Sequence, residues 1–307
     1  MGDTVLEIGD TALASAENFK QAAKVILNNP KYQHVIVSAP GKRLEHDTSV
    51  AELLRSLRHT EHPIETMRAV KERFIEIARG CELEQSFVDA LIAILDESGD
   101  RFKKLRCENR FDYIESRGEY LSALILTKVL GPGWQCIDAT KLIRFSISGR
   151  YDAIMTRRTI RRAKLSGNVV IPAYYAGDSR GKIHTFSQDT SANTGAIIAA
   201  MIGAELYEYA TDAPGVYMAN PNMLSMTPTL IGRMSYSQMQ EMAYSVMRQS
   251  ARLESQGFPR DSSGSKLRTI PGRMCILMAT SGPPPITALR ALPKSRDSRC
   301  SPSRSPG

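Results

Sequence analysis

The sequence predicts an α/β protein, a three-layer α/β/α sandwich with a mainly parallel central sheet. Short β-branched runs alternate along the first 250 residues with segments of helical spacing, which is typical of parallel strands buried on both faces. The composition, 42% hydrophobic and 23% charged, is that of a globular chain. The longest apolar run, Gly195 to Ala204, is shorter than the roughly 20 residues of a membrane span.

Five runs of β-branched and apolar residues predict the strands. They are Thr4–Ile8, His34–Ala39, Asn168–Tyr174, Lys182–Phe186 and Leu206–Tyr209. The fourth follows Asp178-Ser179-Arg180-Gly181, a turn sequence that indicates a hairpin. The helices are predicted from apolar residues spaced three and four apart. They cover Phe19–Ile26, Ile64–Ala78, Leu83–Leu95, Glu119–Leu130, Ala192–Ile202 and Tyr236–Met247.

Charge divides the chain near residue 250. From Arg252 onward there are ten basic and three acidic residues, so +7 of the net charge of +8 lies there, with eight of the sixteen prolines. Such a composition buries too little apolar surface to offset the chain entropy. We therefore expect a folded domain over residues 1–250 and, over 251–307, a disordered tail or a non-native ending produced by a change of reading frame or splicing.

Cysteine and histidine usage argues against metal sites and disulfides. The five cysteines are scattered without CxxC pairing, and the five histidines lack ligand spacing. The acidic N-terminus lacks the pattern of a signal peptide, so we expect a cytoplasmic protein, with organellar import left open. No membrane partner is expected.

Five segments in a fixed order carry a family resemblance. They are VLEIGDTALASAENF (Val5–Phe19), VIVSAPGKR with DTSVAELL (Val35–Leu54), SRGEYLSA (Ser116–Ala123), the segment Val169–Glu208, and ATDAPGVYMANPNML (Ala210–Leu224). Together they resemble the kinase domain of aspartate kinases, in the amino-acid kinase family. The resemblance implies ATP-dependent phosphorylation of the L-aspartate side chain, the first step toward lysine, threonine and methionine. It also implies L-aspartate or a similar amino acid as substrate, ATP and Mg²⁺ as cofactors, and pairing with a second copy or a paralogue.

The resemblance assigns site residues position by position. The family's catalytic lysine and aspartate correspond to Glu7 and Ala192, both replaced. The substrate positions are Ser38, Ala39, Ala51, Glu119 and Gln188, of which Ala51 and Gln188 replace a threonine and an arginine. The nucleotide positions are Gly9, Thr11, Ser191, Thr211, Asp212, Gly215, Tyr217 and Asn222, with Asn222 in place of an arginine. In the first loop, Asp10 replaces a family glycine.

These replacements leave several interpretations open. A carboxylate at residue 7 would repel a triphosphate, and loss of one stabilising group commonly lowers a rate by about 10²–10³. Without the resemblance, however, Glu7 and Asp10 would be read as solvated acids beside a strand, Glu119 as an acid at a helix start, and Asp212 with Gly215 as a plain turn. The alternative function is an inactive family member that binds amino acid or nucleotide and regulates an active paralogue. Nucleic-acid binding rests on the basic tail alone and is not expected.

Overall fold

The computed structural model describes residues 3–105, 109–186 and 193–211, together with the backbone of strands at 233–234, 265–270 and 274–280. The helices in these parts are α1 (Ala16–Leu27), α2 (Val50–Ser56), α3 (Pro63–Gly80), α4 (Gln85–Lys104), α5 (Asn109–Glu115), α6 (Arg117–Leu130), α7 (Ala153–Ala163) and α8 (Asn193–Ile202), with short 3-10 helices η1 (Thr11–Leu13) and η2 (Ala139–Lys141). The strands are β1 (Thr4–Ile8), β2 (Tyr32–Val37), β3 (Trp134–Cys136), β4 (Asn168–Pro172), β5 (Tyr175–Gly177), β6 (Ile183–Thr185), β7 (Leu206–Thr211), β8 (Arg233–Met234), β9 (Ser265–Ile270) and β10 (Met274–Thr280).

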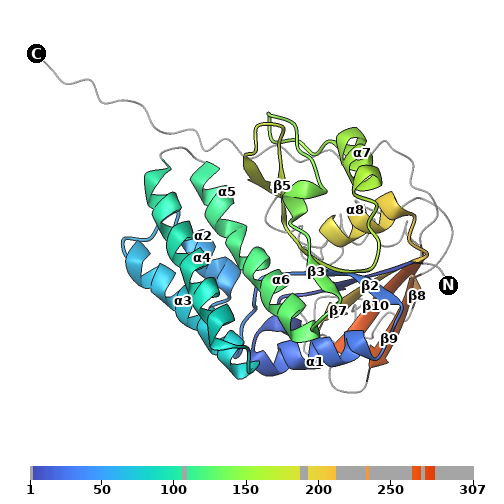
Figure 1. The fold of residues 1–307 in the computed structure, drawn as a ribbon, viewed down its shortest axis with the longest axis horizontal. Helices are drawn as coiled ribbons and strands as arrows, with labels where there is room; N and C mark the ends of the chain where they lie inside the picture. The colour runs from blue at the N-terminus through green and yellow to red at the C-terminus, as the bar shows by residue number, and fades with distance from the viewer. Residues whose placement is uncertain are drawn as a thin grey trace, which may run out of the picture.

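The main sheet has the order β3-β4-β2-β1-β7-β10-β9-β8. The five strands β3, β4, β2, β1 and β7 run parallel, and β10, β9 and β8 continue the sheet with antiparallel pairing. In Figure 1 the layer of α1 and α6 and the layer of α7 and α8 lie on opposite sides of this sheet. The prediction of a three-layer sandwich with a mainly parallel sheet is therefore confirmed.

Side-chain alternation along the parallel strands builds two cores. Leu6 and Ile8 of β1 pack in the larger core with α1, α3, α4 and α6. Val5, with Ile36 of β2, faces the smaller core with α7 and α8. Because successive side chains of a strand point to opposite faces, Glu7 shares the α8 side with Val5. This placement decides what Glu7 contacts.

Most predicted elements are present with shifted ends. The predicted hairpin is confirmed, since β6 pairs antiparallel with β5. Asp178 shapes its turn, because its Oδ1 accepts the N–H groups of Arg180 and Lys182 at 2.8 and 2.9 Å, and Gly181 takes a φ of 76°. The predicted helix at Tyr236–Met247 lies outside the described residues.

Two strands of the main sheet, β9 and β10, lie within the basic tail, and β10 pairs antiparallel with β7 from Cys275–Thr211 to Thr280–Leu206. The disorder that the composition predicts for the rest of the tail stays a prediction. The run MCILMAT is apolar enough to form a strand, although the composition averaged over 251–307 is not. Among the described residues, no helix is both long enough and apolar enough to cross a membrane.

Candidate functional site

The predicted substrate residues Ser38, Ala39, Ala51 and Glu119 come from three neighbouring elements. Ser38 and Ala39 follow the last residue of β2, Glu119 lies in the first turn of α6, and Ala51 lies in the first turn of α2. The carboxyl ends of parallel strands are where α/β sheets bind their ligands. The structure therefore brings Ser38, Ala39 and Glu119 together at the end of a sheet strand.

Gly118 allows α6 to approach the end of β2. A Cβ atom at Gly118 would lie 2.8 Å from Ala39 Cβ and 3.3 Å from Leu54 Cδ1. The first of these distances is shorter than real Cβ contacts and the second is tight, so a larger residue would push α6 away from β2 and α2. The glycine of SRGEY thus positions the glutamate that follows it.

Glu119 is a buried carboxyl group with unused hydrogen-bonding capacity. The residue is 5% exposed, and among the described residues no partner bonds its Oε2. Burial raises the pKa of Glu119 to about 8, the Glu115 carboxylate adds to the rise, and hydrogen bonds from the backbone of Glu119 and Ala39 with the charge of Arg55 oppose it. Nearby, the buried hydroxyl of Ser38 also lacks a partner in the described part of the chain. A cationic ligand group at Glu119 would satisfy the carboxylate and restore its charge.

Tyr174, just after β4, interacts electrostatically with Glu119 and has a strained backbone conformation. Its φ is 74°, which is rare for a bulky residue and is found where the surrounding structure imposes it. Its N–H donates to Thr194 Oγ1 at 3.0 Å, and its hydroxyl donates to Glu115 Oε2 at 3.2 Å. Glu115 Oε1 in turn accepts Arg58 Nε at 2.6 Å, which ties the chain after α2 to α5. No local sequence signal predicts this network.

Arg73 organises the loop between β2 and α2. The buried guanidinium donates to Gly41 O at 3.1 Å, to Asp47 Oδ2 at 2.6 Å and to Thr48 O at 3.3 Å. Arg43 also bonds Asp47, and this hydrogen bond is the main reason that the pKa of Asp47 is held well below its usual range. The motif DTSVAELL therefore owes its position to a distant arginine on α3, which sequence reasoning missed.

Glu7 is not a solvated acid. It is fully buried, and its Oε2 accepts the Tyr207 hydroxyl at 2.8 Å and the Gly195 N–H at 3.0 Å. Gly195 lies in the first turn of α8, where backbone N–H groups and the helix dipole favour an anion. A Cβ at Gly195 would collide with the Glu7 carboxylate, so only glycine allows this approach. The carboxylate of Glu7 thus takes a helix N-terminal donor that an anionic ligand could use.

The first loop is closed by protein contacts. Gly9 N–H donates to Ala210 O at 2.8 Å, and a Cβ at Gly9 would lie 2.6 Å from the Tyr209 hydroxyl. The exposed Asp10 caps η1 by accepting the Thr11 N–H at 2.8 Å. For Asp10, the interpretation as an ordinary surface acid at a turn therefore agrees with the structure.

Several assigned residues lie outside the described part of the chain. They are Gln188, Ser191, Ala192, Asp212, Gly215, Tyr217 and Asn222. Thr211 ends β7 and pairs through its backbone with Cys275. The functional assignments of Thr211 and of the residues outside the described part stay predictions.

The fold and the site together define an α/β domain with a buried carboxyl group beside the end of one parallel strand and a glycine turn at the end of the next. Residues 4–254 match the family model described as Amino acid kinase family. This match covers most of the chain. The protein therefore belongs to the amino acid kinase family.

Named relatives narrow the resemblance within that family. The chain is 28% identical over 255 residues to aspartokinase 3 of Bacillus subtilis, covering 78% of this chain and 55% of the relative. It is 25% identical to a bifunctional aspartokinase/homoserine dehydrogenase of Haemophilus influenzae, covering 78% of this chain and 32% of the relative. The chain thus spans about half the length, or less, of these relatives.

Solved structures agree with the sequence matches. Clostridium acetobutylicum aspartate kinase superposes with a TM-score of 0.66 at 30% identity, covering 80% of this chain and 55% of that one. E. coli aspartokinase III, solved in complex with aspartate and ADP, has a TM-score of 0.68 at 20% identity, covering 78% and 56%. This second likeness concerns the fold. The chain is an aspartate kinase-like member of the amino acid kinase family.

Proposed function

We propose that the domain binds L-aspartate or a similar amino acid, with the ammonium group on Glu119, and that its reaction is ATP-dependent phosphorylation of the side-chain carboxylate. The observation that carries the proposal is the buried Glu119, whose Oε2 lacks a partner among the described residues. A carboxylate with an open acceptor position at a strand end suits an ammonium group. The aspartate kinases that the chain resembles, one of them solved with aspartate and ADP, support the same ligands.

The acceptor needs no general base. The side-chain carboxylate of aspartate is ionised at neutral pH, so the protein has to position it and to stabilise charge on the transferred group. Glu119 would orient the amino acid through its ammonium group, and Tyr174 with Ser38 would border the rest of the molecule. All three side chains are buried, and Glu115 holds the hydroxyl of Tyr174.

The described residues fit a magnesium–nucleotide complex poorly at Glu7. A family lysine would place a cation there, whereas this carboxylate already accepts the Gly195 N–H. We therefore derive no transfer step through Mg²⁺-ATP from the residues of this chain, and we expect turnover to be slow.

Glu7 also favours a second function. A family member that binds its amino acid without transferring phosphate could regulate an active paralogue. In that case the buried carboxylate holds the α8 terminus in place of a phosphate.

A coupled assay of ADP release with L-aspartate and ATP, beside calorimetric titration of each ligand, separates these functions. Slow turnover together with aspartate binding supports the kinase function. Binding of either ligand without turnover supports the inactive, regulatory function. Glu119→Gln should weaken aspartate binding about 10- to 100-fold, as loss of a charged hydrogen bond of about 1.5–3 kcal/mol requires. Absence of aspartate binding in the unaltered protein would defeat the proposed substrate.

Restoring the family residues tests the reason for slow turnover. Glu7→Lys combined with Ala192→Asp should raise the rate of ADP release if these two replacements limit it. No gain would show that the other replaced positions dominate.

A further inference from the structure

A pocket lies on the side of α6 opposite Glu119. It has a volume of about 410 Å³ and is formed by α4, α5 and α6 on one side and by η2 and the β5–β6 hairpin on the other. None of the residues assigned to the amino-acid site lines it. Arg117 and Glu119 are two residues apart on a helix, so they point in nearly opposite directions. The pocket is therefore separate from the amino-acid site.

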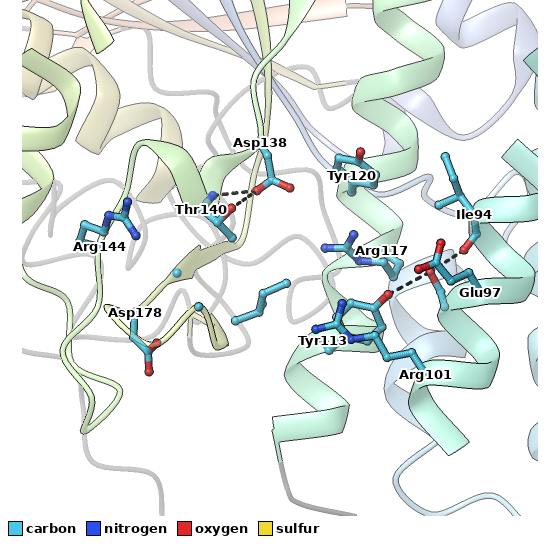
Figure 2. A pocket seen from close by; sticks show the side chains of 14 residues that line it. Ile94, Glu97, Arg101, Tyr113, Arg117, Tyr120, Asp138, Thr140, Arg144 and Asp178 are labelled. Carbon is cyan, nitrogen blue, oxygen red and sulfur yellow. Dashed lines mark hydrogen bonds between the residues drawn. The ribbon is translucent and has the colours of Figure 1, made fainter. Parts of the chain in front are cut away.

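Arg117 is the buried charge of this pocket. The residue is 8% exposed, and its guanidinium carbon lies 4.9 Å from the Tyr113 ring, 4.7 Å from the Tyr120 ring and 5.7 Å from the Tyr175 ring. Its Nε and Nη2 donate to one acceptor, Ser116 Oγ, at 3.2 and 2.9 Å. Figure 2 shows the guanidinium directed into the space facing Asp138 and Thr140.

The acids of the pocket do not neutralise Arg117. Asp178 is bonded to His184 Nε2 at 3.0 Å and to the N–H groups of its own turn. Asp138 Oδ1 accepts both the N–H and the hydroxyl of Thr140. Glu97 is exposed at the rim. Among the described residues, no carboxylate lies within ion-pair distance of Arg117.

Two more arginines, Arg101 and Arg144, lie at the rim of the pocket. Arg101 lies over the Tyr113 ring at 4.4 Å, and the half-buried Arg144 faces the pocket from the opposite side (Figure 2). Neither makes an ion pair with a carboxylate in the described part of the chain. A buried guanidinium is costly without a counter-charge, and the aromatic rings offset only part of that cost.

We propose that this pocket binds a small organic anion, whose carboxylate or phosphate group is held by Arg117 with Arg101 and Arg144 at the rim. A volume of about 410 Å³ is within the range of small-molecule sites. The planar guanidinium presents paired donors that match a carboxylate or a phosphate. The tyrosine rings fix its orientation, so little entropy is lost on binding.

The test uses the full chain without ATP or aspartate, so its outcome is independent of the proposed function. Inorganic phosphate and malonate are titrated calorimetrically into the unaltered protein and into Arg117→Gln, Arg144→Gln and Arg110→Gln. Arg110 is the matched control, because its guanidinium also stacks on aromatic rings, those of Phe102 and Phe111, but does not line the pocket.

We expect saturable binding of at least one anion. Arg117→Gln should weaken it tenfold or more, Arg144→Gln several-fold, and Arg110→Gln not at all. Tighter binding of malonate would indicate a carboxylate ligand, and tighter binding of phosphate a phosphorylated one. Because Arg117→Gln could unfold the protein, the half-buried Arg144 supplies an independent variant. Absence of saturable binding, or binding that neither pocket substitution weakens, would overturn the proposal.

Discussion

A buried carboxylate, that of Glu7, occupies the position where the family resemblance implies a catalytic lysine. Glu7 lies in the centre of the sheet, where an acid is costly unless its oxygens are bonded. The Tyr207 hydroxyl and the Gly195 N–H supply such bonds to Oε2. The chain therefore accommodates the acid structurally, and Glu7 is part of the core at the start of α8.

Removing the charge of Glu7 while keeping its shape should strengthen nucleotide binding. Glu7→Gln retains an oxygen acceptor for Gly195 but removes the negative charge that a triphosphate would meet. We expect ATP affinity to rise about tenfold, which corresponds to about 1.4 kcal/mol. Calorimetric titration of ATP measures it. Tyr207→Phe is the control, since it removes one donor and keeps the charge, and should not strengthen binding. Equal affinity in Glu7→Gln and the unaltered protein would contradict a repulsive role.

Glu119 should make amino-acid binding depend on pH. Burial raises the pKa of Glu119 to about 8, so below that pH the carboxyl group is mostly protonated and cannot pair with an ammonium group. Affinity for L-aspartate should therefore rise with pH from 6 to 8, by at most about tenfold per unit. In Glu119→Gln this rise should disappear. A calorimetric series across the range checks it, and the same slope in the variant would assign the dependence to another group.

The raised pKa of Glu119 also predicts how the free energy of unfolding changes with pH. Between the ordinary pKa of 4.5 and the folded value of about 8, the folded state holds a proton on Glu119 that the unfolded state has released. This group therefore makes the protein less stable as pH rises through that window. Urea unfolding at pH 5, 6, 7 and 8 should show a shallower fall in Glu119→Gln. An unchanged profile in the variant would mean that Glu119 ionises at its ordinary pKa.

At the scale of elements, periodicity predicts the long helices and the central strands well. The helical spacing in Ile64–Ala78 corresponds to α3, and the β-branched run Thr4–Ile8 is β1 without change. Periodicity fails for the three-residue strands β3 and β5, since such short segments become strands only through their pairing partners.

Candidate site residues could be predicted from the sequence only where they lie in a motif shared with the family. The resemblance indicated Glu119, Ser38 and Ala39, and the structure brings them together. It could not indicate Arg73, whose contacts with the loop after β2 depend on tertiary packing. Nor could it indicate the positive φ of Tyr174, because no local sequence preference favours a bulky residue there.

Two helical glycines offer a matched test of how α6 is positioned. A Cβ at Gly99 in α4 would meet only Met67 Cε at 3.8 Å, an ordinary contact, whereas a Cβ at Gly118 would lie 2.8 Å from Ala39 Cβ. We expect Gly99→Ala to raise the free energy of unfolding by about 0.5–1 kcal/mol, and Gly118→Ala to lower it by about 1–3 kcal/mol. Urea unfolding measures both. Gly118→Ala should also weaken aspartate binding. Stabilisation by both substitutions would show that α6 does not rest on the end of β2.

At the scale of the whole molecule, the backbone pairing of β10 with β7 connects the parallel half of the sheet to residues beyond 250. Composition assigns those residues to a separate basic tail, and the family match ends at residue 254. A chain in which β10 completes the sheet and a chain whose folded domain ends near residue 250 should respond differently to removal of the last residues. If β10 completes the sheet, its loss leaves β7 as an edge with unpaired N–H and C=O groups.

A chain ending at residue 254 should therefore be less stable than the full chain and more prone to associate through β7. The measurements are the urea midpoint and the molecular mass in solution at several concentrations. A control chain that ends at residue 280 keeps β9 and β10 and removes only the residues after them. We expect the control to match the full chain in both measurements. Equal midpoints and masses for all three chains would instead place the domain boundary near residue 250, and β10 would then contribute nothing to the stability of the folded domain.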